Sequence, residues 1–590
     1  MIEHRDAIDA EKFAIAAGHD LATQAGMEIL ENGGNAVDAG VAAGIALGVL
    51  HSDLVNFAGV APIMIRMADT QEVITIDGLG VWPEAASVEF FEERYGGAMP
   101  TGIHRTVVPA APAAWIAALS KYGTMSFGDV AHFAATYARE GFPVYRVFAQ
   151  FIETNQEAYR KDQPTADIYL PGGTPPAVGD TFVQRDLADT IQYMIDQERA
   201  SKGDRQAGIQ AARDAFYKGD IAKKITDYHE ANEGFLRQSD LANYEVQFEA
   251  PIKAAFADND VYACGAWCQG ISLAQAFRML DHIDIAALGH NTPDYIHTVA
   301  EALKLVFADR EAFVTDPAFA DVPVAEMLAD PYLKDRLSMI DAAKACPEMP
   351  LAGDPLGHVP AMQGNTDASK TLANQRLSDP HDTEPRDPHQ LKDPGSADTS
   401  YVAAIDAQGN MFSATPSDTS ADTVVIPGTG ICPSSRGSQS RGTRTSINAL
   451  APGKRPRLTP NPALAIKDGK PLMAFGTPGG DVQIQAMVQV FLNTYVFGMD
   501  IQSAIEAPRF GTYSFPSSFA PNTYHPGLLM LEQSIPDDVF ENLKARGHKT
   551  ERWEDGTWKA GGVLAVQQDP KSGHRLAGAD PRRAGTARGV

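Results

Sequence analysis

Apolar residues along positions 19–50 recur at helical spacing and are interrupted once, by Asn32-Gly33-Gly34. Glycine readily adopts the left-handed conformation that ends helices. The pattern therefore predicts one helix over about 21–31 and a second from about Ala36, packed together as a helical hairpin. Asp20 is expected to cap the first helix, because its carboxylate can accept hydrogen bonds from the free N–H groups at a helix start.

The middle of the chain mixes short strands with helices and ends in a polar segment. Residues 72–78 (EVITIDG) alternate as a strand does, and the strand-like stretches 251–256 and 260–265 interrupt a region up to 337 in which helical spacing dominates. Residues 363–398 lack apolar periodicity and are dense in Asp, Pro, Ser and Thr. Such a segment buries too little apolar surface to order itself, so we expect a mobile surface loop there.

The remainder of the chain, 399–590, is rich in strand patterns and contains one strongly helical stretch, VQIQAMVQVFLNTYVFGM. Its first two strands, YVAAID and MFSAT, are predicted to form an antiparallel hairpin that places Asp406 opposite Asn410. The same register places Thr399 opposite Ser417, and the Cβ atoms of such cross-strand partners lie about 5 Å apart. Two hydroxyl groups are therefore expected to meet at the open end of the hairpin.

Composition narrows the class of protein. The chain has 590 residues, of which 44% are hydrophobic and 21% charged, as in globular proteins, and its length suggests three or four units. The longest apolar stretch, 39–50, is shorter than the roughly 20 residues that span a bilayer, so we expect a buried helix and no membrane partner. The charged start, MIEHRDAIDAEK, does not resemble a secretory signal, which favours a cytoplasmic location.

Charge and cysteine content exclude further classes of function. The formal net charge of −26 would repel phosphate backbones, which argues against nucleic acid as a partner and otherwise favours solubility. The four cysteines, at 264, 268, 346 and 432, lack the spacing of zinc sites and are expected to be buried free thiols in a reducing compartment. No metal or organic cofactor is implied.

Thr399 gains a chemical role if the bond between Asp398 and Thr399 is cut. The cut would give Thr399 a free α-amino group, with a reference pKa of about 7.7 to 8, next to its own hydroxyl. That amine can act as the general base for a threonine nucleophile. The alternative is an ordinary strand face, on which Ser and Thr are common.

A glycine pair offers the donors that such a nucleophile needs. The segment AFGTPGGD, 474–481, follows a predicted strand and precedes the helical stretch, so the N–H groups of Gly479 and Gly480 can converge as an oxyanion hole. A phosphate site and a plain turn are the alternatives. The acidic Asp481 and the absence of a lysine disfavour phosphate.

Together these segments resemble the γ-glutamyltransferase family of N-terminal nucleophile hydrolases. The matching motifs occur in the family's order: HDLATQAGMEILENGGNAVDAGVAA, LANYEVQFEAPI, TSYVAAIDAQGN, KRPRLTPNPALAIKDGKP, AFGTPGGD and AIEAPRF. The resemblance implies an α+β, four-layered αββα sandwich. It also implies a proenzyme that cleaves itself into a large subunit, 1–398, and a small subunit, 399–590, which stay together as an intertwined heterodimer that can dimerise further.

The resemblance assigns roles to residues. Thr399 would be the nucleophile, Ser417 takes the place of a threonine that hydrogen-bonds it, and Gly479 and Gly480 match the oxyanion glycines. The family's clamp for the glutamyl group is altered, since Leu79 stands where an arginine would bind the α-carboxylate. The remaining positions of the family's clamp are occupied here by Thr419, Leu458, Thr459 and Gln439.

Arg436 and Arg441 lie near the altered clamp in the sequence. Either could receive a different anion, and the alternative is that both are solvated loop charges. The motif SRG after PGTGI resembles divergent members of the family, among them oxamate amidohydrolase-like and cephalosporin acylase-like proteins.

Three hypotheses about function follow. The first is a self-processing amidohydrolase that acts on a small amide-bearing metabolite through an acyl-enzyme. The second retains γ-glutamyl transfer or glutathione hydrolysis, with a rearranged carboxylate clamp that uses Arg436. The third is an unprocessed, non-catalytic relative that binds a ligand.

Overall fold

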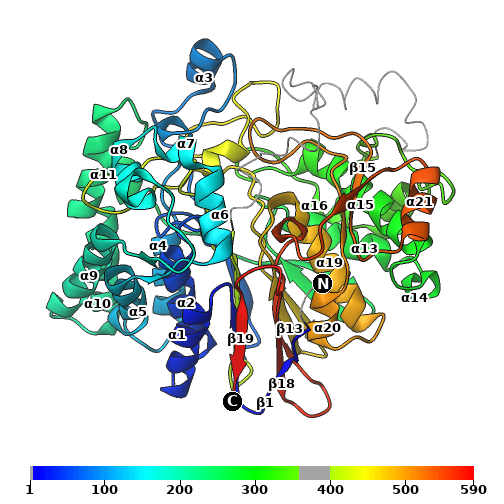
Figure 1. Ribbon diagram of the computed structural model, residues 1–590, viewed down its shortest axis with the longest axis horizontal. Coiled ribbons are helices and arrows are strands. Elements are labelled where there is room, and N and C mark those ends of the chain that lie inside the picture. Colours follow the sequence, from blue (N-terminus) through cyan, green and yellow to red (C-terminus); the bar gives the residue numbers. More distant parts are fainter. Residues whose placement is uncertain (1–3, 358–398) are drawn as a thin grey trace.

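The computed structural model describes residues 4–357 and 399–590 (Figure 1). The surface loop predicted over 363–398, and with it the cleavage position Asp398, lies outside the described residues. Two seven-stranded sheets form the centre of the molecule. Their strands come from both ends of the chain, so the two sheets do not divide into consecutive units along the sequence.

The first sheet holds the predicted hairpin between strands from the first eighty residues. All of its neighbouring strands are antiparallel. Its order is β19 (Thr586–Gly589), β2 (Ala14–Ala17), β10 (Val402–Ile405), β11 (Met411–Ala414), β3 (Ile63–Arg66), β4 (Val73–Ile76) and β7 (Phe248–Glu249). Ile405 pairs with Met411, and Asp406 donates its N–H to the Asn410 carbonyl at 3.2 Å, so the predicted register is confirmed.

The second sheet contains the strands predicted near 251–256 and 260–265. Its order is β1 (Ile8–Ala10), β18 (Arg575–Ala579), β17 (Leu564–Gln568), β13 (Lys470–Gly476), β12 (Ala463–Lys467), β9 (Asn259–Ala263) and β8 (Ile252–Phe256). Because β1 pairs with β18 and β2 with β19, the first and last segments of the chain are neighbours in both sheets.

The two sheets pack face to face through an apolar interface. Along β10, Tyr401, Ala403 and Ile405 face the second sheet, where they meet residues such as Leu464 and Val566. The alternate residues of β10 pack against the helices on the other side, as the period of two along a strand requires. Figure 1 shows the strands between two bodies of helices.

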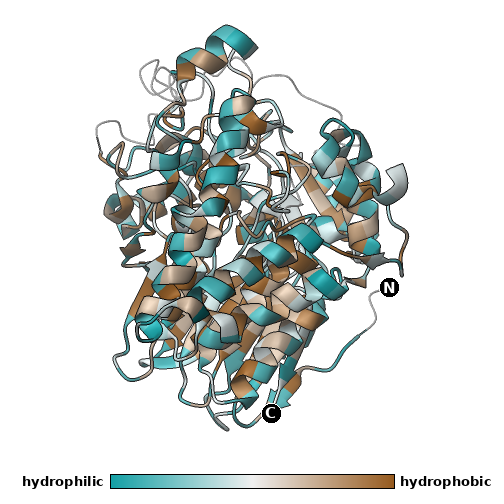
Figure 2. Ribbon diagram, turned by 90° about the vertical axis from the view of Figure 1, so that its left-hand side faces the viewer, coloured by the Kyte–Doolittle hydropathy of each residue, from teal (hydrophilic) through white to brown (hydrophobic). Residues whose placement is uncertain are grey.

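Helices cover the outer face of each sheet. α1 (Asp20–Glu31) and α2 (Ala36–Leu50) lie on the first sheet, and every residue of α2 is buried, as predicted for its apolar stretch. The second sheet is covered by α13 (Gly270–Leu280), α19 (Gln483–Tyr495) and α20 (Ile501–Glu506), and α15 (Pro293–Phe313) packs against α13. The layer order is helix, sheet, sheet, helix. Figure 2 shows the apolar strands and helix segments inside more polar outer helices.

The remaining elements surround this sandwich. The helices are α3 (Val88–Tyr95), α4 (Ala111–Tyr122), α5 (Phe127–Glu140), α6 (Arg146–Thr154), α7 (Gln156–Tyr159), α8 (Gln163–Tyr169), α9 (Arg185–Ala200), α10 (Arg205–Tyr217), α11 (Asp220–Ala231), α12 (Gln238–Ala242), α14 (Ile285–Leu288), α16 (Val324–Met327), α17 (Asp330–Leu337) and α21 (Asp537–Ala545). The strands are β5 (Phe142–Pro143), β6 (Thr181–Phe182), β14 (Phe510–Thr512), β15 (Leu528–Glu532) and β16 (Lys549–Trp553). Within the described ranges, no helix is both long enough and apolar enough to cross a membrane.

The cap of α1 differs from the prediction. His19, with extended backbone angles, is the N-cap, and its Nδ1 accepts the Leu21 N–H at 3.2 Å. Asp20 is instead the first helical residue, where its negative charge lies in the positive field of the helix N-terminus. The turn to α2 matches the prediction, since Gly33 has φ +89° and Asn35 forms a capping box with Asp38.

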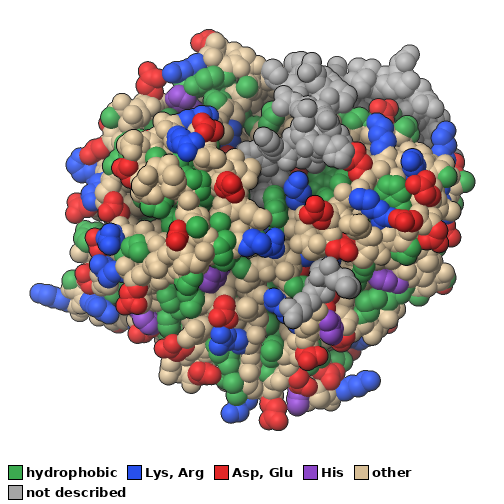
Figure 3. Space-filling view, in the orientation of Figure 1, with side chains coloured by type: hydrophobic (Ala, Val, Ile, Leu, Met, Phe, Trp, Pro, Cys, Tyr) green, Lys and Arg blue, Asp and Glu red, His purple; other side chains and the backbone are tan. Residues whose placement is uncertain are grey.

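The four cysteines are free, and all but Cys346 are buried. The prediction of buried thiols therefore holds for Cys264, Cys268 and Cys432, whereas Cys346 is partly accessible. On the face shown in Figure 3, acidic and basic side chains are interspersed rather than gathered by sign.

Candidate active site

The open end of the β10–β11 hairpin brings together the two predicted hydroxyl groups. Thr399 and Ser417 form an antiparallel bridge, as the register predicted, and Thr399 Oγ1 lies 2.7 Å from Ser417 Oγ. Val60, just before β3, bridges Ser417 from the other side through backbone hydrogen bonds of 3.0 and 3.3 Å. Both hydroxyl residues are buried, so backbone ladders hold them in a fixed geometry inside the protein.

Arg436 reaches the same hydroxyl group. It begins a short 3₁₀ helix, Arg436–Gln439, and its Nη2 donates a hydrogen bond to Ser417 Oγ. Its Nε lies 3.2 Å from Asp418 Oδ1, and its guanidinium is 5.4 Å from the Phe519 ring centroid. The side chain is 1% exposed, so the alternative of a solvated loop charge is wrong for Arg436.

Arg441 is also buried, but it belongs to a different network. Its Nη2 lies 3.5 Å from Glu311 Oε2, and Arg457 Nη2 lies 2.8 Å from Glu311 Oε1. Burial raises the pKa of Glu311, but the charges of Arg457, Arg310 and Arg441 outweigh it and lower that pKa to about 2. Arg441 is therefore a partner in a buried ion network and is not a loop charge in solvent.

Asp418 is a site residue that the sequence reasoning missed. Its carboxylate accepts hydrogen bonds from Ser434 Oγ at 2.6 Å and Ser435 Oγ at 2.9 Å in addition to its ion pair with Arg436. Burial raises its pKa, and Arg436 opposes this effect. Its φ of +115° is costly for a residue with a side chain. The sequence signal was present, since Asp418 directly follows Ser417.

The glycine pair occupies the predicted strand-to-helix turn. β13 ends at Gly476 and α19 begins at Gln483; between them Gly479 and Gly480 have φ of +124° and +56°. The Gly480 carbonyl accepts a hydrogen bond from Gln269 Nε2 at 3.1 Å, which fixes the turn. Residues with side chains rarely adopt these angles, so the turn favours glycine at both positions.

The residues at the altered clamp positions pack or form hydrogen bonds inside the protein. Leu79 and Leu458 lie in the apolar interface between the sheets. Gln439 donates to Thr459 Oγ1 at 2.9 Å, and Thr419 Oγ1 accepts the Ala421 N–H at 3.2 Å. The structure thus places Thr419 and Gln439 near the hairpin but gives both side chains partners within the chain.

A pocket borders the glycine turn. It is lined by Gly479, Asp481, Val482, Tyr513, Phe515, Ser517, Phe519, Thr523, His525, Trp558 and Lys559. Most of these residues come from 513–525 and 558–559, two segments to which the sequence analysis assigned no role. Phe519 connects the pocket to the hydroxyl pair, because the same ring lies beside Arg436.

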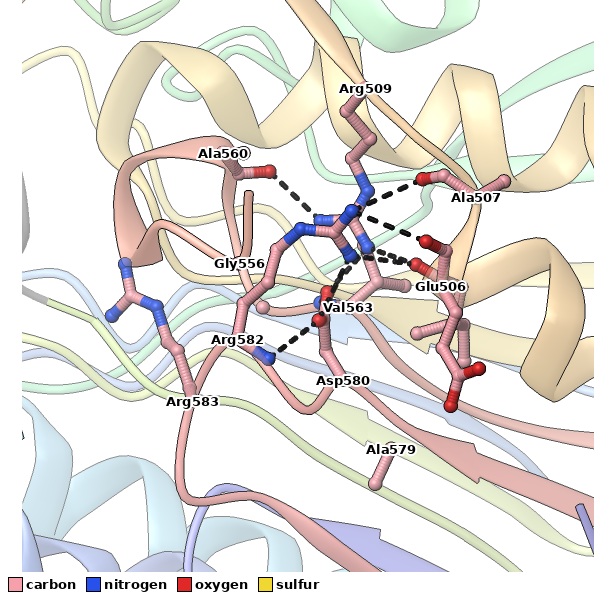
Figure 4. Close-up of polar contacts among 12 residues, drawn as sticks. Glu506, Ala507, Arg509, Gly556, Ala560, Val563, Ala579, Asp580, Arg582 and Arg583 are labelled. Atoms are coloured by element: carbon pink, nitrogen blue, oxygen red, sulfur yellow. Dashed lines mark hydrogen bonds and ion pairs between the residues drawn. The ribbon is translucent and has the colours of Figure 1, made fainter. Parts of the chain in front are cut away.

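Buried arginines fix the wall that carries Trp558 (Figure 4). Arg509 Nη1 donates to the Ala560 carbonyl at 2.8 Å, and its Nη2 pairs with Asp580. Arg582 Nη2 lies 2.6 Å from Glu532 Oε2, and its Nη1 lies 3.1 Å from Asp580 Oδ1. Arg583 points away from this cluster in Figure 4 and donates from Nη2 to the Trp558 carbonyl at 3.0 Å.

Behind the hairpin, the loop after α2 buries several polar groups. Gly18 has no room for a side chain, since a Cβ there would lie 2.0 Å from Ser400 Oγ and 3.0 Å from His51 Cε1. Asp53 lies two residues after His51 in the loop that follows α2. Neither of its carboxylate oxygens accepts a hydrogen bond of normal geometry from a described residue. Burial raises the pKa of Asp53 to about 7, although the Arg583 charge opposes this.

Comparison with known proteins agrees with this architecture. The family Gamma-glutamyltranspeptidase matches residues 22–590. The chain is 31% identical over 569 residues to the Acylase ACY 1 proenzyme of Pseudomonas sp. (strain SE83), covering 94% of this chain and 90% of that protein. It is 30% identical over 583 residues to the glutathione hydrolase-like YwrD proenzyme of Bacillus subtilis (strain 168), covering 98% of each.

A solved structure shares the whole fold. The crystal structure of cephalosporin acylase from Bacillus halodurans superposes with a TM-score of 0.84 at 26% identity and covers 100% of this chain and 97% of that one. The family match and both relatives extend over nearly the full length of the chain. The chain therefore belongs to the gamma-glutamyltranspeptidase family of hydrolases and transpeptidases.

Proposed function

We propose that the protein is a self-processing amidohydrolase whose nucleophile is Thr399, exposed as a new N-terminus by cleavage after Asp398. The observation that carries this proposal is the 2.7 Å contact of Thr399 Oγ1 with Ser417 Oγ at the end of a buried hairpin. Family membership supports it, and both relatives named above are described as proenzymes. The large subunit would be 1–398 and the small subunit 399–590.

In the proposed reaction, the α-amino group of Thr399 takes the proton from its own Oγ1. Oγ1 then bonds to the carbonyl carbon of the substrate amide, and the developing oxyanion receives hydrogen bonds from the N–H groups of Gly479 and Gly480. As the C–N bond breaks, the proton passes to the leaving nitrogen. Water adds to the resulting ester in the same way, and the acid leaves with Thr399 restored.

Arg436 and Asp418 would help by setting the direction of a hydrogen bond. Arg436 can only donate, so Ser417 Oγ accepts from it, and the Ser417 proton can then be donated to Thr399 Oγ1. A donor aimed at Oγ1 stabilises the negative charge that develops there when its own proton leaves. Asp418 holds the guanidinium in place through its ion pair.

The substrate is expected to be a small amide other than a standard γ-glutamyl donor. Leu79 is buried in the core, and Arg436 is engaged by Ser417 and Asp418, so neither is placed as a bidentate clamp for an α-carboxylate. The names of the relatives leave both acylase and glutathione hydrolase activity as precedents. Release of chromophore from a γ-glutamyl anilide would favour the second activity.

The decisive experiment follows processing. Purified protein on a denaturing gel should show two fragments that divide the 63.2 kDa chain about two to one, and the smaller should begin Thr-Ser-Tyr. Thr399→Ala should remain a single chain and be inactive. Thr415→Val removes another buried hydroxyl two residues from Ser417 and should still process. A folded wild-type chain that stays intact would support a non-catalytic relative instead.

A further inference from the structure

A cluster of buried polar side chains lies against the first half of α15. His297 and Glu301 are one helical turn apart on α15, and His548 lies between α21 and β16. All three residues are at most 5% exposed. One ring nitrogen of each histidine and one oxygen of Glu301 lie within 4.8 Å of one another. Because the histidines are 251 positions apart in the sequence, their spacing forms no recognisable metal motif.

The two imidazole rings of the cluster face each other. His297 Nδ1 lies 2.9 Å from His548 Nε2, and His297 Nε2 lies 2.9 Å from the Asp341 carbonyl oxygen. Burial lowers the pKa of both rings, so each ring is neutral and carries one proton. Since a carbonyl can only accept, the His297 proton is on Nε2, and Nδ1 presents its lone pair to His548.

Neither neutral form of His548 gives both of its nitrogens a partner. With the proton on Nε2, the ring donates to His297, and no described residue donates to Nδ1; Glu301 Oε1, 4.0 Å away, is itself an acceptor. With the proton on Nδ1, the lone pairs of two nitrogens face each other at 2.9 Å. A buried acceptor without a donor is unfavourable, and a cation bound between these groups would remove that penalty.

Glu301 is the third possible ligand, and it is shared with a buried lysine. Its Oε1 lies 2.7 Å from Lys304 Nζ, and its Oε2 accepts the Cys346 N–H at 3.0 Å. A carboxylate has about four lone-pair sites, so each oxygen keeps one for a metal. Lys304 also donates to the Cys346 carbonyl at 2.8 Å. Its positive charge opposes a second cation nearby, so Lys304 limits the affinity of the cluster for a metal.

The cluster lies close to the protein surface. Asp341, whose carbonyl faces His297, is exposed. A surface pocket is lined in part by Thr298 and Ile340, which are the chain neighbours of His297 and Asp341. An ion therefore has a short route from solvent to the imidazole rings.

We propose that His297, Glu301 and His548 bind a divalent transition metal, with Zn²⁺ as the expected ion. Imidazole nitrogens and a carboxylate oxygen are ligands that zinc prefers, and a hydrogen bond such as that from His297 to the Asp341 carbonyl typically orients a metal-binding ring. Tetrahedral ligands about 2.0 to 2.1 Å from zinc lie about 3.3 Å from one another, so small side-chain rotations complete the site.

This inference goes beyond the proposed function and does not depend on it, because the three residues already meet in the uncleaved chain. His297 and Glu301 belong to the proposed large subunit, and His548 belongs to the proposed small subunit. After the proposed cleavage, the metal would therefore hold the two subunits together through side chains of both.

Zinc titration of untagged protein, first treated with a chelator, tests the inference. Isothermal titration calorimetry should show one saturable site per chain, and zinc should raise the Tm. Glu301→Gln and His548→Gln, shown to be folded by circular dichroism, should each weaken binding at least about 10-fold. His132→Gln removes an exposed histidine on α5 and should bind zinc as the wild type does.

Lys304→Met provides an independent test that does not remove a ligand. It takes away the opposing cation, so we expect it to bind zinc at least about 10-fold more tightly and to be stable only when zinc is present. Thr399→Ala should bind zinc as the wild type does, which separates metal binding from processing. No saturable binding by the folded wild-type protein, or equal binding by the wild type, Glu301→Gln and His548→Gln, would overturn the inference.

Discussion

Arg436 illustrates how one side chain determines what its neighbours can do. Its guanidinium cannot accept a hydrogen bond, so its contact with Ser417 fixes the acceptor role of that oxygen. The ion pair with Asp418 is fully buried, and removing one partner of such a pair leaves an uncompensated charge that costs about 3 to 5 kcal/mol. Specific residues therefore set the direction of the hydrogen bonds around Thr399.

A second residue-scale effect concerns Asp53, whose buried carboxylate accepts no hydrogen bond of normal geometry from a described residue. Its pKa rises to about 7 in the folded state, above the usual value of 3.8. The folded state therefore binds more protons than the unfolded state between these values, and stability falls as pH rises through that window. Asp53→Asn removes this loss and should stabilise the protein at pH 8, by at most on the order of 4 kcal/mol.

Urea unfolding of wild type and Asp53→Asn at pH 5 and pH 8 measures this effect. The gain from the variant should be clearly larger at pH 8 than at pH 5. Asp129→Asn, at an exposed position in the capping box of α5, serves as the control. A gain from Asp53→Asn that is equal at both pH values would show that the carboxylate is ionised in the fold.

At the scale of elements, the segment 556–563 depends on a cluster of charges outside itself. The Asp580 carboxylate forms ion pairs with Arg509 and Arg582. It also accepts a hydrogen bond from the Val563 N–H at 3.0 Å. Burial raises the pKa of Asp580, but the two arginines outweigh it and lower that pKa. The cluster therefore joins the end of β18 to the pocket wall that carries Trp558.

Asp580→Asn should both destabilise the protein and loosen the pocket. It leaves Arg509 and Arg582 with less negative charge in a buried site, so we expect a loss of about 3 kcal/mol or more in the free energy of unfolding. Chemical denaturation measures that loss, and kcat/KM on any hydrolysed amide reports the pocket. Asp537→Asn removes the exposed partner of Arg552 and should leave both quantities unchanged. A stable Asp580→Asn protein would contradict the role of the cluster.

Much of this element-level structure could be predicted from the sequence, because it depends on local signals. The hairpin register follows from alternation about a short turn, and the glycine turn follows from a strand, two glycines and a helix. The pocket could not be predicted in this way. Phe519 and Trp558 come from irregular segments whose contacts depend on the packing of β14–β16 and on buried arginines, and no period in the sequence encodes those contacts.

Across the whole molecule, the fold buries histidine side chains in surroundings that favour their neutral form. Burial lowers the pKa of His19 to about 4, of His229 to about 3 and of His548 to about 2; Arg237 adds to this effect at His229 and Lys304 at His548. Below about pH 6.5 the unfolded chain binds protons at these histidines that the folded chain excludes, so stability falls as pH decreases.

Each such histidine contributes up to about 1.4 kcal/mol per pH unit to this slope. The free energy of unfolding, measured at several values between pH 7 and pH 4.5, should therefore decline steeply, and His229→Gln should make the decline shallower. His132→Gln, at an exposed position on α5, should leave the slope as in wild type. An unchanged slope in His229→Gln would mean that the residue is protonated in the fold.

The pairing of the outermost strands has a consequence for how the protein could be rebuilt. β2 and β19 are hydrogen-bonded neighbours, and the Lys12 N–H donates to the Val590 carbonyl at 2.6 Å. A short linker could therefore join residue 590 to the start of the chain, while new ends are opened between 398 and 399. Such a circular permutant would be translated with Thr399 immediately after its initiator methionine, so that aminopeptidase trimming alone would expose its α-amino group. The proposed maturation and the proposed hydrolysis could then be studied one at a time.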